Sequence, residues 1–360
     1  MLVSLKTTNS LLAQTCRFSA FNSLHKLRKY FQSTKILHLI LIKWKNEKMN
    51  EIVRRNMERK KCANVGGQAV IEGVMMRNGS LLATAVRKPN GDIVYKKTVF
   101  SDKRTKFTKI PFVRGAVVLF DSLVLGIKEL TFSANQSEEN EEEQLSNKEA
   151  VMTTVVSLAL GIGLFMVLPS ILGGFIFKHD RIYANIMEAF LRLVFFLIYI
   201  WGISFSKDVK RVFEYHGAEH KTIYAYENGE ELTADNAKKY TTLHPRCGTS
   251  FLLIVMLTAI IVFSIMDFII PVPETMIGRI GLKVVLRVGL MPLIAGISYE
   301  LQRYSSNHLD KLWVRVLASP GLALQKITTK EPDKSQLEVA VVAMKAALGM
   351  EIDNATEVYK

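Results

Sequence analysis

The sequence predicts an α-helical integral membrane protein with about four transmembrane helices and a small cytoplasmic β-hairpin unit. Composition is the first reason, because a mean hydropathy of +0.17 and 49% hydrophobic residues are high for a soluble enzyme. The second reason is that four apolar runs approach the length needed to cross a bilayer. The third is an Asn-Gly turn between two alternating segments, which is the strongest short-range signal for a β-hairpin.

The positive charge of the chain lies mostly at its N-terminus. Of the formal net charge of +14, residues 1–61 supply +11, with 14 Lys or Arg against 3 Asp or Glu. The rest of the chain therefore needs no basic face for nucleic acid, so we expect no nucleic-acid partner and expect a lipid bilayer instead. Cys16, Cys62 and Cys247 are too far apart for a disulfide framework, which favours a reducing compartment.

Residues 1–63 form a basic N-terminal extension that we expect to be disordered. Residues 1–46 contain eight Lys or Arg and no acidic residue. They are compatible with a mitochondrial-type presequence, although Lys outnumbers Arg, or with a signal anchor, although the apolar run is short. We favour a third interpretation, a start codon assigned too far upstream with Met49 or Met57 as the true start, because ordered patterns begin only after Asn64.

Residues 64–110 are predicted to form a small β unit. Three glycines flank a short apolar run at its start, and residues 81–88 and 92–99 flank the Asn-Gly turn. The phosphate-loop patterns are absent from this glycine-rich stretch. Glu72 lies among apolar residues, so it is a candidate metal or hydrogen-bond ligand, or a substrate-binding carboxylate; an exposed carboxylate at a strand edge is the alternative.

An amphipathic helix and a polar linker are expected next. Residues 111–134 carry Arg114, Asp121 and Lys128, which make them too polar for a confident span and favour a helix at the membrane surface. Residues 135–149 are predicted to be a solvated acidic linker.

A four-span membrane domain is predicted over residues 150–300. The apolar runs are 151–168, 190–205, 251–270 and 281–298. Arg192, Asp267 and Arg287 fall near their outer ends, where snorkelling or an Asp267–Arg287 pair would make the charges tolerable. Because the connection 206–250 is rich in Lys and Arg, both termini and this loop are expected to face the cytoplasm.

The cytoplasmic loop 206–250 holds the strongest functional pattern. If residues 206–227 are helical and continue from the second span, His216 and His220 lie one turn apart on one face, with Glu219 beside them. The pattern His-x-x-Glu-His is typical of a zinc peptidase, in which two imidazoles bind the metal and a carboxylate acts on its water. We therefore expect Zn²⁺ at His216 and His220, and Glu219 as general base.

The remaining roles in this site stay open. The third metal ligand is either Glu300, which leaves the fourth span on the same side, or His244. Lys221 or Arg246 would stabilise an oxyanion or bind an anionic head group. An alternative is a closed structural site in which two further side chains, His244 and Cys247, complete a His₃Cys tetrahedron with His216 and His220.

A third possibility is that no metal binds. Histidines at a membrane boundary also hydrogen-bond to carbonyls or lipid phosphates, and Gly217 weakens the helix that the geometry needs. A cysteine-hydrolase role for Cys247 is weaker, because no family signature surrounds it.

Residues 301–360 are predicted to be a cytoplasmic C-terminal tail with one amphipathic helix. The helix would start at Pro332 and end at Gly349. We expect it to dock on the cytoplasmic face or on a second subunit, which makes a homodimer a candidate assembly.

Several motifs resemble those of the YqhQ family of bacterial multi-pass membrane proteins, over about residues 64–348. The resemblance implies a protein of the bacterial cell membrane and a metal-dependent enzyme, without a substrate. The function expected from residues and resemblance together is a membrane hydrolase acting on a peptide or lipid at the cytoplasmic face. The alternative is a non-enzymatic factor, that is a transporter, lipid-handling protein or scaffold. The motifs are Gly66-Gly-Gln-Ala-Val-Ile-Glu-Gly-Val-Met-Met-Arg77, Tyr215-His-Gly-Ala-Glu-His-Lys-Thr222, His244-Pro-Arg-Cys-Gly-Thr-Ser250, Ala318-Ser-Pro-Gly321 and Thr328-Thr-Lys-Glu-Pro332.

Overall fold

A computed structural model describes residues 65–99, 110–139, 146–177, 180–271, 273, 275–308 and 311–358. All of them belong to Cys62–Lys360, the second of the two units into which the chain divides. The predictions for residues 1–63 lie outside the described residues, as does the central part of the acidic segment.

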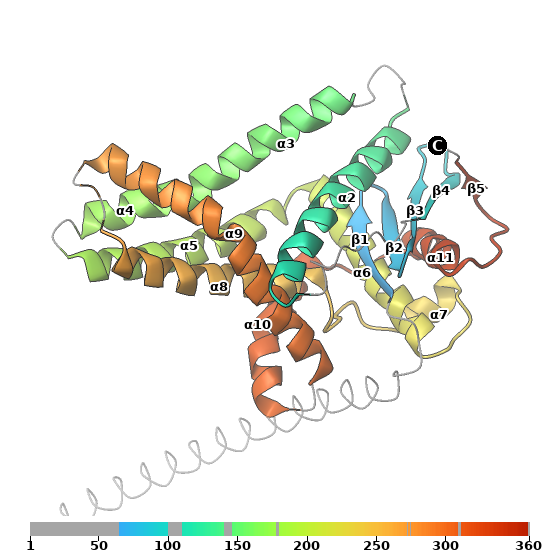
Figure 1. The fold of residues 1–360 in the computed structure, drawn as a ribbon. Helices are drawn as coiled ribbons and strands as arrows, with labels where there is room; N and C mark the ends of the chain where they lie inside the picture. The colour runs from blue at the N-terminus through green and yellow to red at the C-terminus, as the bar shows by residue number, and fades with distance from the viewer. Residues whose placement is uncertain are drawn as a thin grey trace, which may run out of the picture. The chain divides into compact units, whose positions relative to one another are not determined.

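The first part of the described chain and a short segment near its end together form a five-stranded sheet (Figure 1). Strands β1 (Val65–Val70), β2 (Gly73–Asn78), β3 (Leu81–Arg87) and β4 (Ile93–Val99) make an antiparallel meander. The predicted hairpin between β3 and β4 is confirmed, and Gly91 at its turn has a φ of 93°, which glycine adopts without strain. A short strand near the C-terminus, β5 (Thr356–Glu357), adds parallel to β4 and was not predicted.

Helices cover both faces of this sheet. Alternate strand residues such as Val74 and Ala85 pack with α6 (Lys207–Glu227) and α11 (Lys334–Leu348) in one core. The residues between them, such as Met75 and Val94, face the other side and pack on α2 (Val113–Ser137). The period of two along each strand thus supplies two apolar surfaces, one for each helix layer.

Helix α11 is part of the core rather than a surface-docking tail. Ten of its residues are buried, against both the sheet and α6, so the prediction of an amphipathic helix free to dock on the membrane face or a second subunit is wrong. Because many of its residues are small, the helix packs closely on several sides. A prediction based on a single apolar stripe therefore underestimates how much of the helix is buried. Asp333, in a capping box with Gln336, caps the start of the helix where Pro332 was predicted to begin it, and the predicted end at Gly349 is confirmed, in the left-handed conformation.

Helix α2 connects the sheet to the apolar helices. Leu125 and Phe132 pack on the sheet, whereas Gly115 near the start of the helix lies against Gly296 and Tyr299 of α9. Phe120, at 66% exposure, lies on the uncovered side. The predicted amphipathic helix is therefore present, with one face packed and one apolar face open.

Among the described residues, four helices are long and apolar enough to cross a membrane, as predicted. The second of these helices begins earlier than the predicted apolar run 190–205. Its first two turns contain the charged residue Glu188, which interrupts the apolar pattern but is buried in an ion pair. The Asp267–Arg287 pair is confirmed, with 2.9 Å between Oδ2 and Nη2. The four elements are α3 (Asn147–Ile162) continued by η3 (Gly163–Val167) and α4 (Leu168–Ile176), then α5 (Arg181–Ile203), α8 (Gly248–Ile269) and α9 (Met276–Asn307).

Helix α6 is separate from the second apolar helix, which corrects the prediction of one continuous helix. A turn at residues 204–206 follows α5, and Ser206 takes an extended backbone conformation at the start of α6. This break lets α6 leave the direction of α5 and run beneath the sheet (Figure 1). A short helix, α7 (Ala234–Lys238), follows with Thr233 as its cap, as predicted.

One helix was missed. Helix α10 (Leu312–Thr328) packs mainly against α8 and contains Pro320. Pro320 and Gly321 lower the expected helix content of this stretch, but Gly321 lies directly against Ser250 of α8, where a larger side chain would collide. The close helix contact therefore outweighs the poor local propensity. The end of α10 and the chain that follows it lie beside α6. The carbonyl group of Thr328, the last residue of α10, is therefore part of the site described below.

Gly217 makes the close contact between α6 and the chain that follows α10. A Cβ atom at this position would come within 2.0 Å of the Lys330 carbonyl oxygen. We expect Gly217→Ala to reduce the stability of the protein by about 1–3 kcal/mol, because backbone atoms must move apart. The measurement is thermal unfolding of the purified protein in detergent. Gly202→Ala in α5 is the matched control, since nothing lies within 4 Å of that added methyl group; equal behaviour of the two variants would contradict the close-contact explanation.

Candidate functional site

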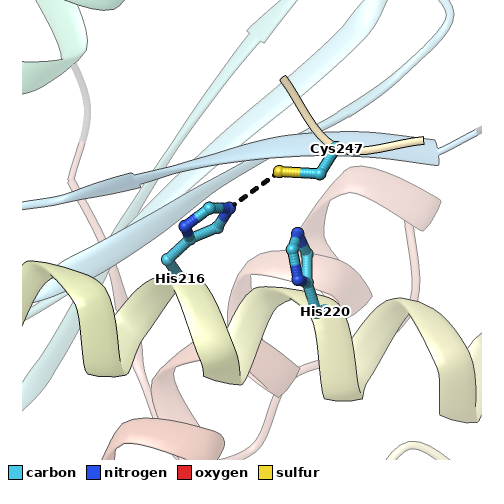
Figure 2. Close-up of side chains that lie close together, drawn as sticks. All are labelled: His216, His220 and Cys247. Carbon is cyan, nitrogen blue, oxygen red and sulfur yellow. Dashed lines mark hydrogen bonds between the residues drawn. The ribbon is translucent and has the colours of Figure 1, made fainter. Parts of the chain in front are cut away.

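Two histidines on α6 face the same side of the helix. The ring centroids of His216 and His220 are 4.4 Å apart, and both rings extend toward Cys247 (Figure 2). This arrangement confirms the shared helix face that their spacing predicts.

The hydrogen bonds of these rings fix their tautomers. His216 Nδ1 donates to the carbonyl oxygen of Thr328 at 2.8 Å, and His220 Nδ1 donates to that of Thr242 at 2.5 Å. A carbonyl oxygen only accepts, so each Nδ1 carries a proton, and the neutral form of each ring would have its lone pair at Nε2. Burial lowers the pKa of His220, which keeps that ring neutral.

The Nε2 atoms lie beside the thiol of Cys247. His216 Nε2 is 3.0 Å from Cys247 Sγ, whereas His220 Nε2 is buried without a hydrogen-bond partner among the described residues. Cys247 precedes the first turn of α8, and its sulfur accepts from the backbone N–H of Thr249. Burial alone would raise the pKa of Cys247, but interactions with His220 and the hydrogen bonds from Thr249 outweigh it and lower the pKa.

This cluster has the donor set of a metal site. One ligand atom from each of His216, His220 and Cys247 lies within 4.8 Å of the others. Metal-bound histidines usually donate the other ring N–H to a carbonyl or carboxylate, which is what both rings do here. A thiol with two imidazoles suits a borderline-soft transition metal. The residues present therefore fit a bound metal ion.

Glu219 lies next to the cluster in a space that a glycine provides. A Cβ atom added at Gly67 of β1 would come within 2.9 Å of Glu219 Oε1, so only glycine accommodates the carboxyl group against this strand. Glu219 is 5% exposed, and burial raises its pKa to about 8. Near neutral pH the group holds a proton that it can release.

His244 lies close to the cluster but outside the three-residue group. Its ring centroid is 5.5 Å from that of His220, and its Nε2 atom is 3.7 Å from Glu227 Oε2. The side chain of Gln325 on α10 holds the His244 backbone, accepting from its N–H and donating to its carbonyl oxygen, both at 2.8 Å. Thus α10 positions the loop that carries both His244 and Cys247.

The two cations predicted to bind anions are engaged in ion pairs. Lys221 is buried and pairs with Glu331, and its ammonium also donates to the carbonyl oxygen of Lys238. Arg246 pairs with the buried carboxylate of Glu227. Both pairs tie α6 to neighbouring segments and so help to shape the site.

The structure does not bring Glu72 and Glu300 to the cluster. Glu72 lies at the turn between β1 and β2 with a φ of 50°, and its carboxylate accepts from Arg211 and from the Tyr215 hydroxyl. Glu300 accepts two hydrogen bonds from Arg114 at the start of α2. Each carboxylate neutralises an arginine that lies far from it in sequence, which the sequence alone does not reveal.

Three contributors were not identified from the sequence as site residues: Thr242, Thr328 and Gln325. Two of them act through backbone carbonyl groups, which any residue possesses, so no side-chain pattern marks them. Gln325 is fully buried in a helix, and a buried amide requires partners. That requirement is the one signal that could have singled it out.

Comparison with known proteins identifies the family. Residues 110–350 match the family described as "Protein of unknown function (DUF1385)". The chain is 33% identical over 304 residues to the uncharacterized protein YqhQ of Bacillus subtilis (strain 168), an overlap that covers 79% of this chain and 92% of that protein. No solved structure matches the chain. The matched region includes the three candidate metal ligands His216, His220 and Cys247. The chain belongs to the YqhQ (DUF1385) family.

Proposed function

We propose that this chain is a multi-pass protein of the bacterial cell membrane with a zinc-dependent hydrolase site at the cytoplasmic face, acting on a peptide or lipid. The observation that carries the proposal is the convergence of the two Nε2 lone pairs on the Cys247 sulfur, with the protonated carboxyl group of Glu219 beside them. Two imidazoles and one thiolate leave a tetrahedral zinc ion one position for water.

Membrane insertion is supported by the composition of the four apolar helices and the charge of their connections. Insertion would bury large exposed side chains such as Phe268, at 75% exposure, and Leu160, at 70%. By the positive-inside rule, the Lys- and Arg-rich connection 206–250 supports a cytoplasmic location for the site and both termini. The open apolar face of α2 favours a position at the inner membrane surface.

In this proposal each side chain has a defined task. His216, His220 and Cys247 would hold the metal, and the carbonyl oxygens of Thr242 and Thr328 keep both rings in the ligating tautomer. Bound zinc lowers the pKa of its water to near neutral. In its ionised form, which the charge of a bound dication would favour, Glu219 would take the proton from that water and return it to the leaving group.

A second function is favoured by the position of His244. With its ring 5.5 Å from that of His220, it is a candidate for a fourth ligand. Four protein ligands would close the site and leave no position for water. The metal would then be a structural staple between α6 and α8 in a non-enzymatic membrane protein, such as a transporter, a lipid-handling protein or a scaffold. A homodimer is compatible with either function.

Loss of a direct ligand tests the metal itself. We expect His216→Ala and His220→Ala to lower zinc affinity by more than about a hundredfold, since even loss of an outer partner costs 10–100-fold. Zinc per chain would be measured by elemental analysis of purified protein after equilibration with a chelating buffer. His308→Ala is the control, because this histidine stacks on Tyr304 away from the cluster. Equal zinc content in all three variants would refute the site.

An open coordination position distinguishes enzyme from staple. In the cobalt-substituted protein, acetohydroxamate should change the visible ligand-field absorption if a position is open, and should leave it unchanged if His244 closes the site. We expect the change to occur and to persist in His244→Ala. Glu219→Gln should retain the metal, because this carboxylate is not assigned as a ligand. An unchanged spectrum in the wild type, together with metal loss in His244→Ala, would establish the structural site instead.

The raised pKa of Glu219 predicts how the metal-free protein responds to pH. The native state keeps the Glu219 proton up to about pH 8, whereas the unfolded state releases it near its ordinary pKa of 4.5. The native state therefore binds more protons between these values, and the free energy of unfolding should fall as pH rises from about 5 to about 8. Thermal unfolding after chelation should show this slope reduced in Glu219→Gln. The exposed Glu231→Gln serves as control and should keep it; a wild-type slope in Glu219→Gln would contradict the assignment.

A further inference from the structure

Strand β1 is an edge strand of the sheet, and no described strand pairs with its outer side (Figure 1). Gly66 and Gly67 are exposed, and Gln68 and Ala69 are half-buried. Exposed edges are templates for a further strand, and proteins usually protect them with lysine, proline or a bulge. Strand β1 contains neither a charged residue nor a proline, and it pairs with β2 without a bulge. The edge is therefore open to a further strand.

The register of the sheet shows which backbone groups of β1 face outward. Gly73 of β2 pairs with Val86 of β3, and the Arg87 N–H donates to the Glu72 carbonyl oxygen at 2.9 Å. In an antiparallel ladder this bond marks Gly73 and Val86 as opposite residues that do not bond to each other. The N–H and C=O groups of Gly73 therefore face β1, where the opposite residue is Val70.

Gly67 and Ala69 direct their backbone polar groups to the open edge. Hydrogen-bonded and non-bonded positions alternate along an antiparallel strand, so Val70 and Gln68 bond to β2 and the residues between them do not. In the described part of the chain, nothing hydrogen-bonds to the N–H or C=O groups of Gly67 and Ala69. These groups alternate as donor and acceptor, as the backbone of a partner strand requires.

The open edge lies beside the candidate metal site. A Cβ atom added at Gly67 would lie 2.9 Å from Glu219 Oε1. Glu219 shares one turn of α6 with His216 and His220, whose rings extend toward Cys247 (Figure 2). Neighbouring strands lie about 4.8 Å apart. The backbone of a strand added to β1 would therefore pass close to the Glu219 carboxyl group and the candidate metal ligands.

The chemistry of this edge suits a peptide better than a lipid. A peptide in extended conformation carries donors and acceptors at the spacing of the edge, whereas an acyl chain carries neither and a head group carries them at one end only. The two glycines add no side chain to the edge. Recognition would therefore depend on the main chain of the bound segment.

We propose that the substrate is a polypeptide segment in extended conformation, which binds by adding a strand to the open edge of β1. The proposal rests on the hydrolase function proposed above and decides between its two substrate classes. Hydrolysis would add one water molecule across a C–N bond of the bound segment, giving a carboxylic acid and an amine.

The variant Ala69→Pro tests the edge from the side of the protein. It removes one outward N–H group but no bond to β2, and proline is tolerated at such edge positions. We expect peptide affinity to fall about tenfold, because a carbonyl oxygen of the bound peptide loses its donor. Ala69→Val is the matched control, since valine is similar in size to proline and keeps the N–H group.

A pair of labelled peptides tests the edge from the side of the ligand. The probe is a fluorescein-labelled peptide of eight alternating threonines and valines with every second amide N-methylated. It keeps one hydrogen-bonding edge and cannot stack into sheets of its own. The control peptide has the same sequence with all amides N-methylated, so it keeps no donor. This comparison uses the wild-type protein and stays decisive if Ala69→Pro does not fold.

The measurement is fluorescence anisotropy with the full chain in detergent. We expect the wild type and Ala69→Val to bind the probe with similar affinity, Ala69→Pro to bind it about tenfold more weakly, and the fully methylated peptide to bind to none of them. Equal affinity of the wild type for the two peptides, or equal affinity of the two Ala69 variants for the probe, would overturn the proposal.

Cleavage is measured separately, by mass spectrometry of the unmethylated peptide and of phosphatidylglycerol after incubation with the zinc-loaded protein. Binding of the probe without cleavage of either compound would uphold the strand-addition site and refute the hydrolase function. Cleavage of phosphatidylglycerol without binding of the probe would uphold the hydrolase function and overturn the peptide site in favour of a lipid substrate.

Discussion

Two backbone carbonyl groups determine the geometry of the candidate metal site. The oxygens of Thr242 and Thr328 accept the Nδ1 protons of the two α6 histidines and thereby turn both Nε2 atoms toward Cys247. These carbonyls come from separate segments, the loop after α7 and the end of α10. The site therefore exists only when α6, that loop and α10 are packed together, and most of the contacts around it serve that packing.

Several interactions hold these segments on α6. Gly217 allows the chain after α10 to approach, Lys221 pairs with Glu331 in the same stretch, and the Tyr224 hydroxyl donates to the Leu243 carbonyl oxygen at 2.9 Å. Lys221, predicted to bind a ligand, thus acts as a positioning residue. The motif around the histidines combines candidate metal ligands with the groups that fix their surroundings, which explains why Gly217 and Lys221 lie beside those histidines in the sequence.

The sequence predicted the local parts of the fold and site but not the long-range pairings. The four-residue spacing of the histidines, the Asn-Gly hairpin and the four apolar helices follow from periodicity and length, and all three are confirmed. The partner of Glu300 lies 186 residues away, at Arg114, so the sequence offered no reason to exclude that carboxylate as a ligand. The same limit applies to Glu188, whose cationic partners on α9 are distant in sequence. The break before α6 was missed because residues 204–206 contain neither glycine nor proline.

The core of the sheet unit combines the two ends of the described chain. Strands β1 to β4 come first, yet the apolar face that they share with α6 is completed by α11, and β5 closes the sheet edge after it. During synthesis the strands would emerge early and keep an uncovered apolar surface while all four apolar helices are made. This unit would therefore complete its core only after α11 has been made, and a ribosome stalled before α11 would leave an aggregation-prone sheet attached to the finished apolar helices.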